Sequence, residues 1–131
     1  MATVETLIVA AKVGKYAIAI VGPCASGKSS LARGLGEHGI WARQVVQEHS
    51  YVQEMWQVIA KPDYLIYLEA SFQTCSRRKH LNWRQRDYDE QLSRLAHARQ
   101  SCDLLVQTDD LSEAAVLEEV LSDLRARQLI P

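Results

Sequence analysis

The chain contains the segment Gly22-Pro23-Cys24-Ala25-Ser26-Gly27-Lys28-Ser29, which matches the pattern G-x-x-x-x-G-K-[ST] at every fixed position. Residues 16–21, just before it, are continuously apolar, as in a strand of a parallel sheet that is buried on both faces. Residues 28–36, which overlap its end, have helical spacing, with Leu31 and Leu35 on one face. A glycine-rich loop between a buried strand and a helix is the context that this pattern requires, so we name the segment loop 22–29 and expect it to bind an anion.

The residue types of loop 22–29 suit a polyphosphate. Glycine lets backbone N–H groups approach a polyanion closely, and the positive end of the following helix points at the same place. Lys28 would place its charge between the β- and γ-phosphates, and Ser29 would offer a hydroxyl ligand to Mg²⁺. The loop therefore predicts a site for a nucleoside triphosphate, taken to be Mg-ATP. The residues expected to contact it are Gly22, Cys24, Ala25, Ser26, Gly27, Lys28, Ser29 and Ser30.

The remainder of the chain alternates apolar runs with segments of helical spacing. Strands are expected at residues 16–21, 42–47, 64–69 and 104–107, and helices at 3–12, 28–36, 51–61, 72–79, 87–101 and after residue 110. Ser50 with Gln53, and Asp110 with Glu113, have the capping-box spacing that would start two of these helices. In the helix over 87–101, Leu92, Leu95 and Ala96 are expected to face inward. The alternation predicts an α/β fold, a three-layer sandwich around a short parallel sheet of about four strands in the order 2-1-3-4. A single domain is expected over residues 1–131.

Composition narrows the function classes. The 15 basic and 16 acidic residues leave a formal charge of −1, so no overall field attracts nucleic acid or an anionic membrane. Three widely spaced cysteines form neither a disulfide framework nor a zinc pattern, and we see no secretory signal or membrane-spanning run. We therefore expect a cytoplasmic protein, with a homodimer left open. Cys24 could be a reactive thiol, or only a small residue that fits the loop.

Loop 22–29, with its flanking strand and helix, resembles the P-loop NTPases. Within that class, three later segments look like the nucleoside-monophosphate-kinase group, which includes relatives of shikimate, gluconate and thymidylate kinase. Residues 62–71 look like the strand that those kinases place before a lid helix, and Arg78 falls where many of them carry a lid arginine. Residues 104–111, with Thr108-Asp109-Asp110-Leu111, look like the last strand and a base-binding turn. The resemblance implies the P-loop NTPase fold and a nucleotide contact by Asp109; the alternative is that Asp109 and Asp110 only cap the last helix.

Acidic residues are needed near the metal of such a site. Glu48 follows the second expected strand and would bind Mg²⁺ together with Ser29, or act as the base that accepts a proton from the attacking hydroxyl. The alternative is a simple charge ahead of a helix that begins after Ser50. His49 could act beside Glu48, and Glu69 lies at the same expected edge of the sheet.

Basic residues gather downstream of the third strand. Arginine forks neutralise a phosphoryl group in transfer, so Arg78, Arg84 and Arg86 are candidates for a lid that closes over the nucleotide, with Arg94 and Arg99 within reach on the next helix. The alternative is a solvated basic face. Trp83 among these arginines suggests nucleic acid, but the near-zero net charge weighs against that reading. Trp41, Tyr51 and Trp56 are expected in the core or in a pocket wall.

Together these features predict a small-molecule or nucleotide kinase, in which Lys28, Glu48, Arg78, Arg84 and Arg86 serve the transfer of the γ-phosphate to a small acceptor. One departure from the resemblance favours another class. Fewer than forty residues lie between Lys28 and the third strand, which is short for a substrate-binding segment. The alternatives are a nucleotide-binding sensor or partner module without phosphotransfer, and a simple ATPase.

Overall fold

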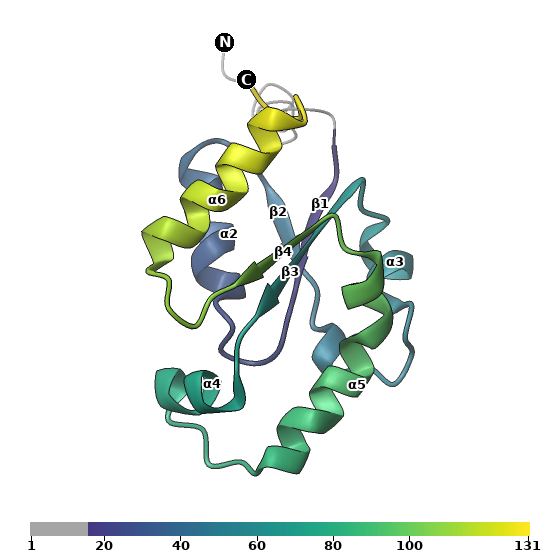
Figure 1. Ribbon diagram of the computed structural model, residues 1–131. Helices are drawn as coiled ribbons and strands as arrows, with labels where there is room; N and C mark the ends of the chain where they lie inside the picture. The colour runs from purple at the N-terminus through teal and green to yellow at the C-terminus, as the bar shows by residue number, and fades with distance from the viewer. Residues whose placement is uncertain (1–15) are drawn as a thin grey trace.

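The computed structural model describes residues 16–131, and its centre is a parallel sheet. The strands are β1 (Ile18–Val21), β2 (Ala42–Gln44), β3 (Tyr64–Glu69) and β4 (Leu104–Gln107), arranged in the order β2-β1-β3-β4 (Figure 1). All neighbouring pairs are parallel. The predicted α/β class, the four strands and their order are confirmed. The helix expected at residues 3–12 lies outside the described residues.

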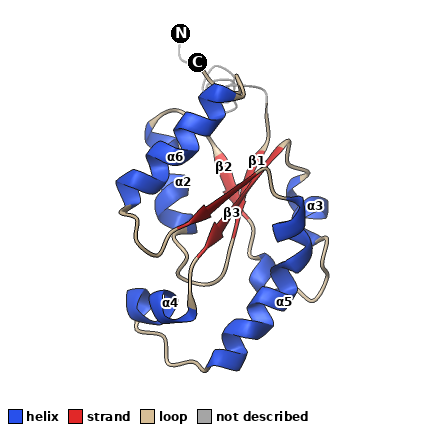
Figure 2. Ribbon diagram, viewed as in Figure 1, coloured by secondary structure: helices blue, strands red, loops and turns tan. Residues whose placement is uncertain are grey.

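Helices cover both faces of this sheet. One face carries α2 (Lys28–Glu37) and α6 (Glu113–Ala126), and the other carries α3 (Met55–Ala60) and α5 (Gln85–Ser101), as Figure 2 shows. The remaining α-helix of residues 16–131, α4 (Phe72–Lys79), lies beyond the carboxyl end of β3. No helix in this described part of the chain combines the length and the apolar character needed to cross a bilayer.

The core is divided in two by the sheet. Ile18 and Ile20 of β1 pack with buried side chains of α2 and α6, whereas Ala19 and Val21 pack with those of α3 and α5. Alternate residues of a strand point to opposite faces, so a strand covered on both sides must be apolar throughout. This explains why all four residues of β1 are buried and why the run that ends at loop 22–29 has no polar position.

The segment before α3 departs from the prediction. The helix begins at Met55, not at residue 51, and Tyr51 is 86% exposed. The predicted capping box does not form, because the Gln53 side chain bonds a different helix. Its amide donates to Ser93 O of α5 at 2.8 Å. Ser50 Oγ instead accepts from Val52 N at 3.1 Å in a local turn.

Three smaller predictions were also wrong. The cap of α6 is Ser112, whose Oγ accepts from Ala115 N at 3.1 Å, because a turn from Thr108 to Leu111 carries Asp110 away from the helix start. Trp41, expected in the core or a pocket wall, is exposed just before edge strand β2. In α5 the inward-facing alanine is Ala98 instead of residue 96.

Candidate functional site

Loop 22–29 opens onto a cavity of about 660 Å³ at the carboxyl edge of the sheet. The wall comes from this loop, the first turn of α2, the 3₁₀ turn η1 (Gln47–His49) after β2, the end of α4 and the start of α6. The carboxyl edge of a parallel α/β sheet is where ligands of such folds generally bind. The volume lies within the usual range for small-molecule sites, about 300–1,000 Å³.

Two glycines are required by the backbone of loop 22–29. A Cβ on Gly22 would lie 2.5 Å from Leu68 O, and 2.6 Å from Ser26 Oγ, so this position touches β3 too closely for any side chain. Gly27 has φ +110°, a conformation that L side chains rarely adopt, and it immediately precedes α2. The two fixed glycines of the sequence pattern therefore have separate physical causes: close packing at the first and backbone conformation at the second.

The N-terminus of α2 carries no side-chain cap. Its first backbone N–H groups have no partner within the helix, and they lie beside the cavity that Gly27, Lys28, Ser29 and Ser30 line. Ser29 Oγ donates to Gln44 Oε1 at 3.0 Å, and Ser30 Oγ donates to Glu113 Oε1 at 3.2 Å. The free backbone N–H groups, together with the helix dipole, favour an anion at the start of α2.

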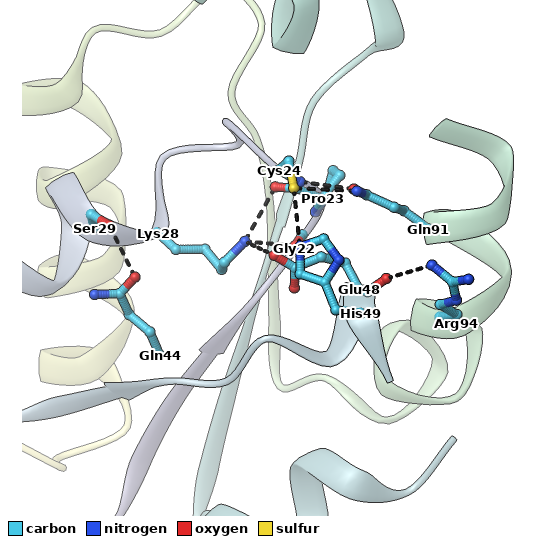
Figure 3. Close-up of polar contacts among 10 residues, drawn as sticks. All are labelled: Gly22, Pro23, Cys24, Lys28, Ser29, Gln44, Glu48, His49, Gln91 and Arg94. Atoms are coloured by element: carbon cyan, nitrogen blue, oxygen red, sulfur yellow. Dashed lines mark hydrogen bonds and ion pairs between the residues drawn. The ribbon is translucent and has the colours of Figure 1, made fainter. Parts of the chain in front are cut away.

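Lys28 is 8% exposed, and its ammonium is surrounded by oxygen atoms (Figure 3). Nζ lies 2.8 Å from Gly22 O, 3.3 Å from Pro23 O and 2.8 Å from Glu48 Oε2. The last contact is a buried ion pair that joins loop 22–29 to η1. Glu48 was expected to follow the second strand, and it does so in η1, beside loop 22–29.

Glu48 is 2% exposed, so its carboxylate is shielded from water and must be stabilised by neighbouring protein groups. Oε2 receives Lys28, but Oε1 has no hydrogen-bond partner among the described residues. The backbone carbonyl of Glu48 accepts from Arg94 Nη1 at 3.3 Å, which fixes η1 against α5. A buried carboxylate with one free oxygen can serve a cation or a proton donor, because an unpartnered buried acceptor carries an unrecovered desolvation cost.

Cys24 lies at the rim of the same cluster (Figure 3). Its Sγ is 3.4 Å from His49 Nε2, and Gln91 Nε2 donates to the sulfur at 3.2 Å. The backbone N–H of Cys24 donates to Gln91 Oε1 at 3.0 Å, so both polar atoms of this glutamine hold one residue of the loop.

Arg78 packs on loop 22–29. Nη1 donates to Ser26 O at 3.3 Å and to Thr108 Oγ1 at 3.0 Å, with a longer contact of 3.4 Å to Ala25 O, and Nη2 donates to Thr108 O. The guanidinium thus joins α4, the loop and the residue that follows β4, and it lines the cavity. In this structure the N–H donors of Arg78 are used by the protein itself.

Other predicted residues are not brought to the cavity. Arg84 and Arg86 are exposed at the start of α5 and do not line it. Asp109 accepts from Ser71 N at 2.9 Å. Burial opposes ionisation of Asp109, but hydrogen bonds from Ser71, Thr74 and Gln107 outweigh it and lower the carboxyl pKa. Glu69 and Arg99 pair with each other at 2.8 Å, while Arg94 contacts Glu90 and η1.

The wall behind Ala25 is apolar and uncharged. Ala25 packs with Ala70, Cys75 and Tyr88. Burial raises the pKa of the Cys75 thiol to about 11 and that of the Tyr88 phenol to about 12. Both groups are therefore neutral at pH 7, and Tyr88 OH donates to Ala70 O at 2.6 Å. The charges of the site come from its rim, not from this wall.

Sequence reasoning missed three polar residues of the site: Gln44, Gln91 and Thr108, of which the last was noted only as part of a turn. Gln91 had a readable signal, because it shares one face of α5 with Tyr88, Leu95 and Ala98, all buried. A glutamine on an otherwise apolar face needs a buried partner. Gln44 and Thr108 carry no such signal, since their partners depend on how the strands end.

Comparison of the sequence with models of known protein families and with curated proteins found no match.

Proposed function

We propose that this chain has the P-loop NTPase fold and binds Mg-ATP in the cavity at loop 22–29. The observation that carries the proposal is the convergence of three groups on one cavity: the uncapped start of α2, the Lys28 ammonium and the Ser29 hydroxyl. These are the donors, the cation and the metal ligand that a triphosphate with Mg²⁺ requires.

The contacts of Lys28 and Ser29 fit this role. The ammonium of Lys28 has three oxygen partners, one of them a carboxylate, so an incoming phosphate would exchange one anionic partner for another. Ser29 is exposed, and within residues 16–131 its hydroxyl bonds only the Gln44 side chain, so it can turn to a metal at little cost. Glu48, once released by Lys28, would hold a water ligand of Mg²⁺ or accept a proton.

The reaction that we propose is transfer of the γ-phosphate to a small hydroxyl or phosphate acceptor. Arg78 is the arginine best placed to support it, because it already lines the cavity. Release of Arg78 from Thr108 would let its fork reach a phosphoryl group.

A second candidate is a nucleotide-binding module without phosphotransfer. The observation that favours it is the place of the other arginines: Arg84 and Arg86 lie away from the cavity, and Arg78 is held by the protein. Incubation with Mg-ATP and a pool of metabolites separates the candidates. A new phosphorylated compound indicates a kinase, phosphate release without an acceptor indicates an ATPase, and stoichiometric binding without turnover indicates the module.

Binding itself is tested by calorimetric titration of Mg-ATP into Lys28→Met. We expect an affinity loss of at least about tenfold, because a charge-assisted contact to phosphate is removed. Lys61→Met is the matched control, since Lys61 is exposed at the end of α3 and ahead of β3, away from the cavity.

Removing Lys28 alone leaves the Glu48 carboxylate buried without its cation, so the variant could lose its fold. The double variant Lys28→Met/Glu48→Gln removes both charges and keeps the side-chain volumes. The proposal predicts weak binding in this folded double variant as well. Wild-type affinity for Mg-ATP in either variant would contradict it.

A further inference from the structure

A second cluster at the rim of the cavity has a different chemistry from the phosphate-binding groups. Cys24, Glu48 and His49 each offer one ligand atom, and these three atoms lie within 4.8 Å of one another. Cys24 comes from loop 22–29, whereas the other two come from η1. Sulfur and imidazole ligands are poor partners for Mg²⁺ and good partners for zinc-like ions.

The distance between sulfur and nitrogen fits one shared ion. Zinc binds sulfur at about 2.3 Å and imidazole nitrogen at about 2.0 Å, so at a tetrahedral angle the two ligands stand about 3.5 Å apart. Cys24 Sγ and His49 Nε2 are separated by 3.4 Å. The separation of these two atoms therefore matches that of two ligands on one ion.

The third ligand is supported by an independent observation. Glu48 is almost fully buried, and its Oε1 has no partner in residues 16–131, although Oε2 is held by Lys28. One carboxylate oxygen of Glu48 lies within 4.8 Å of the ligand atoms of Cys24 and His49. The carboxylate therefore has a free, buried acceptor available to a cation at this cluster.

Supporting contacts orient the ligands. Gln91 donates to Cys24 Sγ and accepts from Cys24 N, which fixes the sulfur against α5. Arg94 donates to the carbonyl of Glu48 and holds η1 in place. Partners of this kind outside the ligand shell set ligand orientation and metal affinity.

We propose that Cys24, Glu48 and His49 bind a thiophilic divalent cation, with Zn²⁺ as the representative ion. The ion takes sulfur, Oε1 and Nε2 as three ligands and water from the cavity as the fourth. The thiol proton passes to solvent as the thiolate coordinates. Exposed His49 gives the ion an entry path from the cavity. This inference does not rest on nucleotide binding.

The test uses the reduced, chelator-treated full chain. Zn²⁺ is titrated calorimetrically, and Co²⁺ is used as a spectroscopic probe of thiolate coordination. We expect one ion per chain and a sulfur-to-cobalt charge-transfer band. Cys24→Ser should abolish the band. Both Cys24→Ser and His49→Gln should weaken Zn²⁺ binding by more than about tenfold, because even changes just outside a ligand shell weaken binding by at least that factor.

Matched controls are Cys102→Ser, a half-buried thiol elsewhere, and His38→Gln, an exposed histidine at the end of α2. Both should bind Zn²⁺ as the wild type does. Thermal melts without metal establish that each variant is folded. Gln91→Ala, which keeps all three ligands, should weaken binding by less than either ligand variant.

Three results would overturn the inference: no charge-transfer band in the wild type, Zn²⁺ affinity unchanged in Cys24→Ser, or displacement of Zn²⁺ by equimolar Mg²⁺. Failure of the nucleotide proposal would be recognised separately, because Mg-ATP binding to Lys28→Met is measured without Zn²⁺.

Discussion

Two buried tyrosines differ in a single hydrogen bond. Tyr67 OH is buried without a partner in the described part of the chain, and burial raises its pKa, so the phenol stays neutral. Tyr88 OH, in contrast, donates to Ala70 O at 2.6 Å. The two hydroxyl groups should therefore contribute to the free energy of unfolding with opposite signs.

We expect Tyr67→Phe to leave the free energy of unfolding unchanged or to raise it, because it removes an unsatisfied polar group. Tyr88→Phe should lower that free energy by about 1 kcal/mol, because the Ala70 carbonyl loses its O–H donor and keeps the weaker Cys75 thiol, which is 3.8 Å away. Urea unfolding of both variants checks the pair. A loss in Tyr67→Phe as large as that in Tyr88→Phe would mean that the Tyr67 hydroxyl has a partner.

At the scale of elements, α2 has two glycines in unlike surroundings. A Cβ at Gly34 would meet Leu117 Cδ2 of α6 at 3.0 Å, whereas a Cβ at Gly36 would meet nothing within 4 Å. Gly34 therefore permits the close approach of α2 and α6, and Gly36 only adds backbone freedom to the unfolded chain.

Gly36→Ala should stabilise the protein by about 0.5–1 kcal/mol, the usual helix preference for alanine over glycine. Gly34→Ala should be the less stable of the two variants, because Leu117 must shift to admit the methyl group. Thermal or urea unfolding of the pair measures the difference. Equal stabilities would show that α2 and α6 separate without cost.

The strands could be predicted because apolar runs between helical segments leave few other arrangements. Loop 22–29 could be predicted because its fixed positions carry the chemistry themselves. The start of α3 could not, since Gln53 bonds α5 instead of capping its own helix. The helix face of Gln91 indicates its burial, but its partner, Cys24, is 67 residues away in sequence and could not be identified. Glu48 was expected to follow the second strand, but its ion pair with Lys28 depends on how η1 turns after β2.

For the whole molecule, the ion pair between Lys28 and Glu48 joins two segments that the sheet alone would leave separate. Both partners are buried, so neither charge can be solvated when the other is removed. The single variants Lys28→Met and Glu48→Gln should each lose about 3–5 kcal/mol of stability. The double variant should recover much of that loss, because it leaves no buried charge.

A double-mutant cycle from urea unfolding measures this coupling. Lys61→Met, at an exposed lysine, provides the reference for a lysine-to-methionine change. Additive losses in the double variant would mean that the two side chains act independently, in spite of the 2.8 Å contact.

The protein neutralises the cation of loop 22–29 with its own carboxylate. Because Glu48 contacts the Lys28 ammonium, any oxyanion that arrives there must replace this counter-ion. Association is then an exchange of anions at an ammonium that also contacts two backbone carbonyl oxygens. Its speed depends on how often the side chains part, and the displaced carboxylate is left free to accept a different cation.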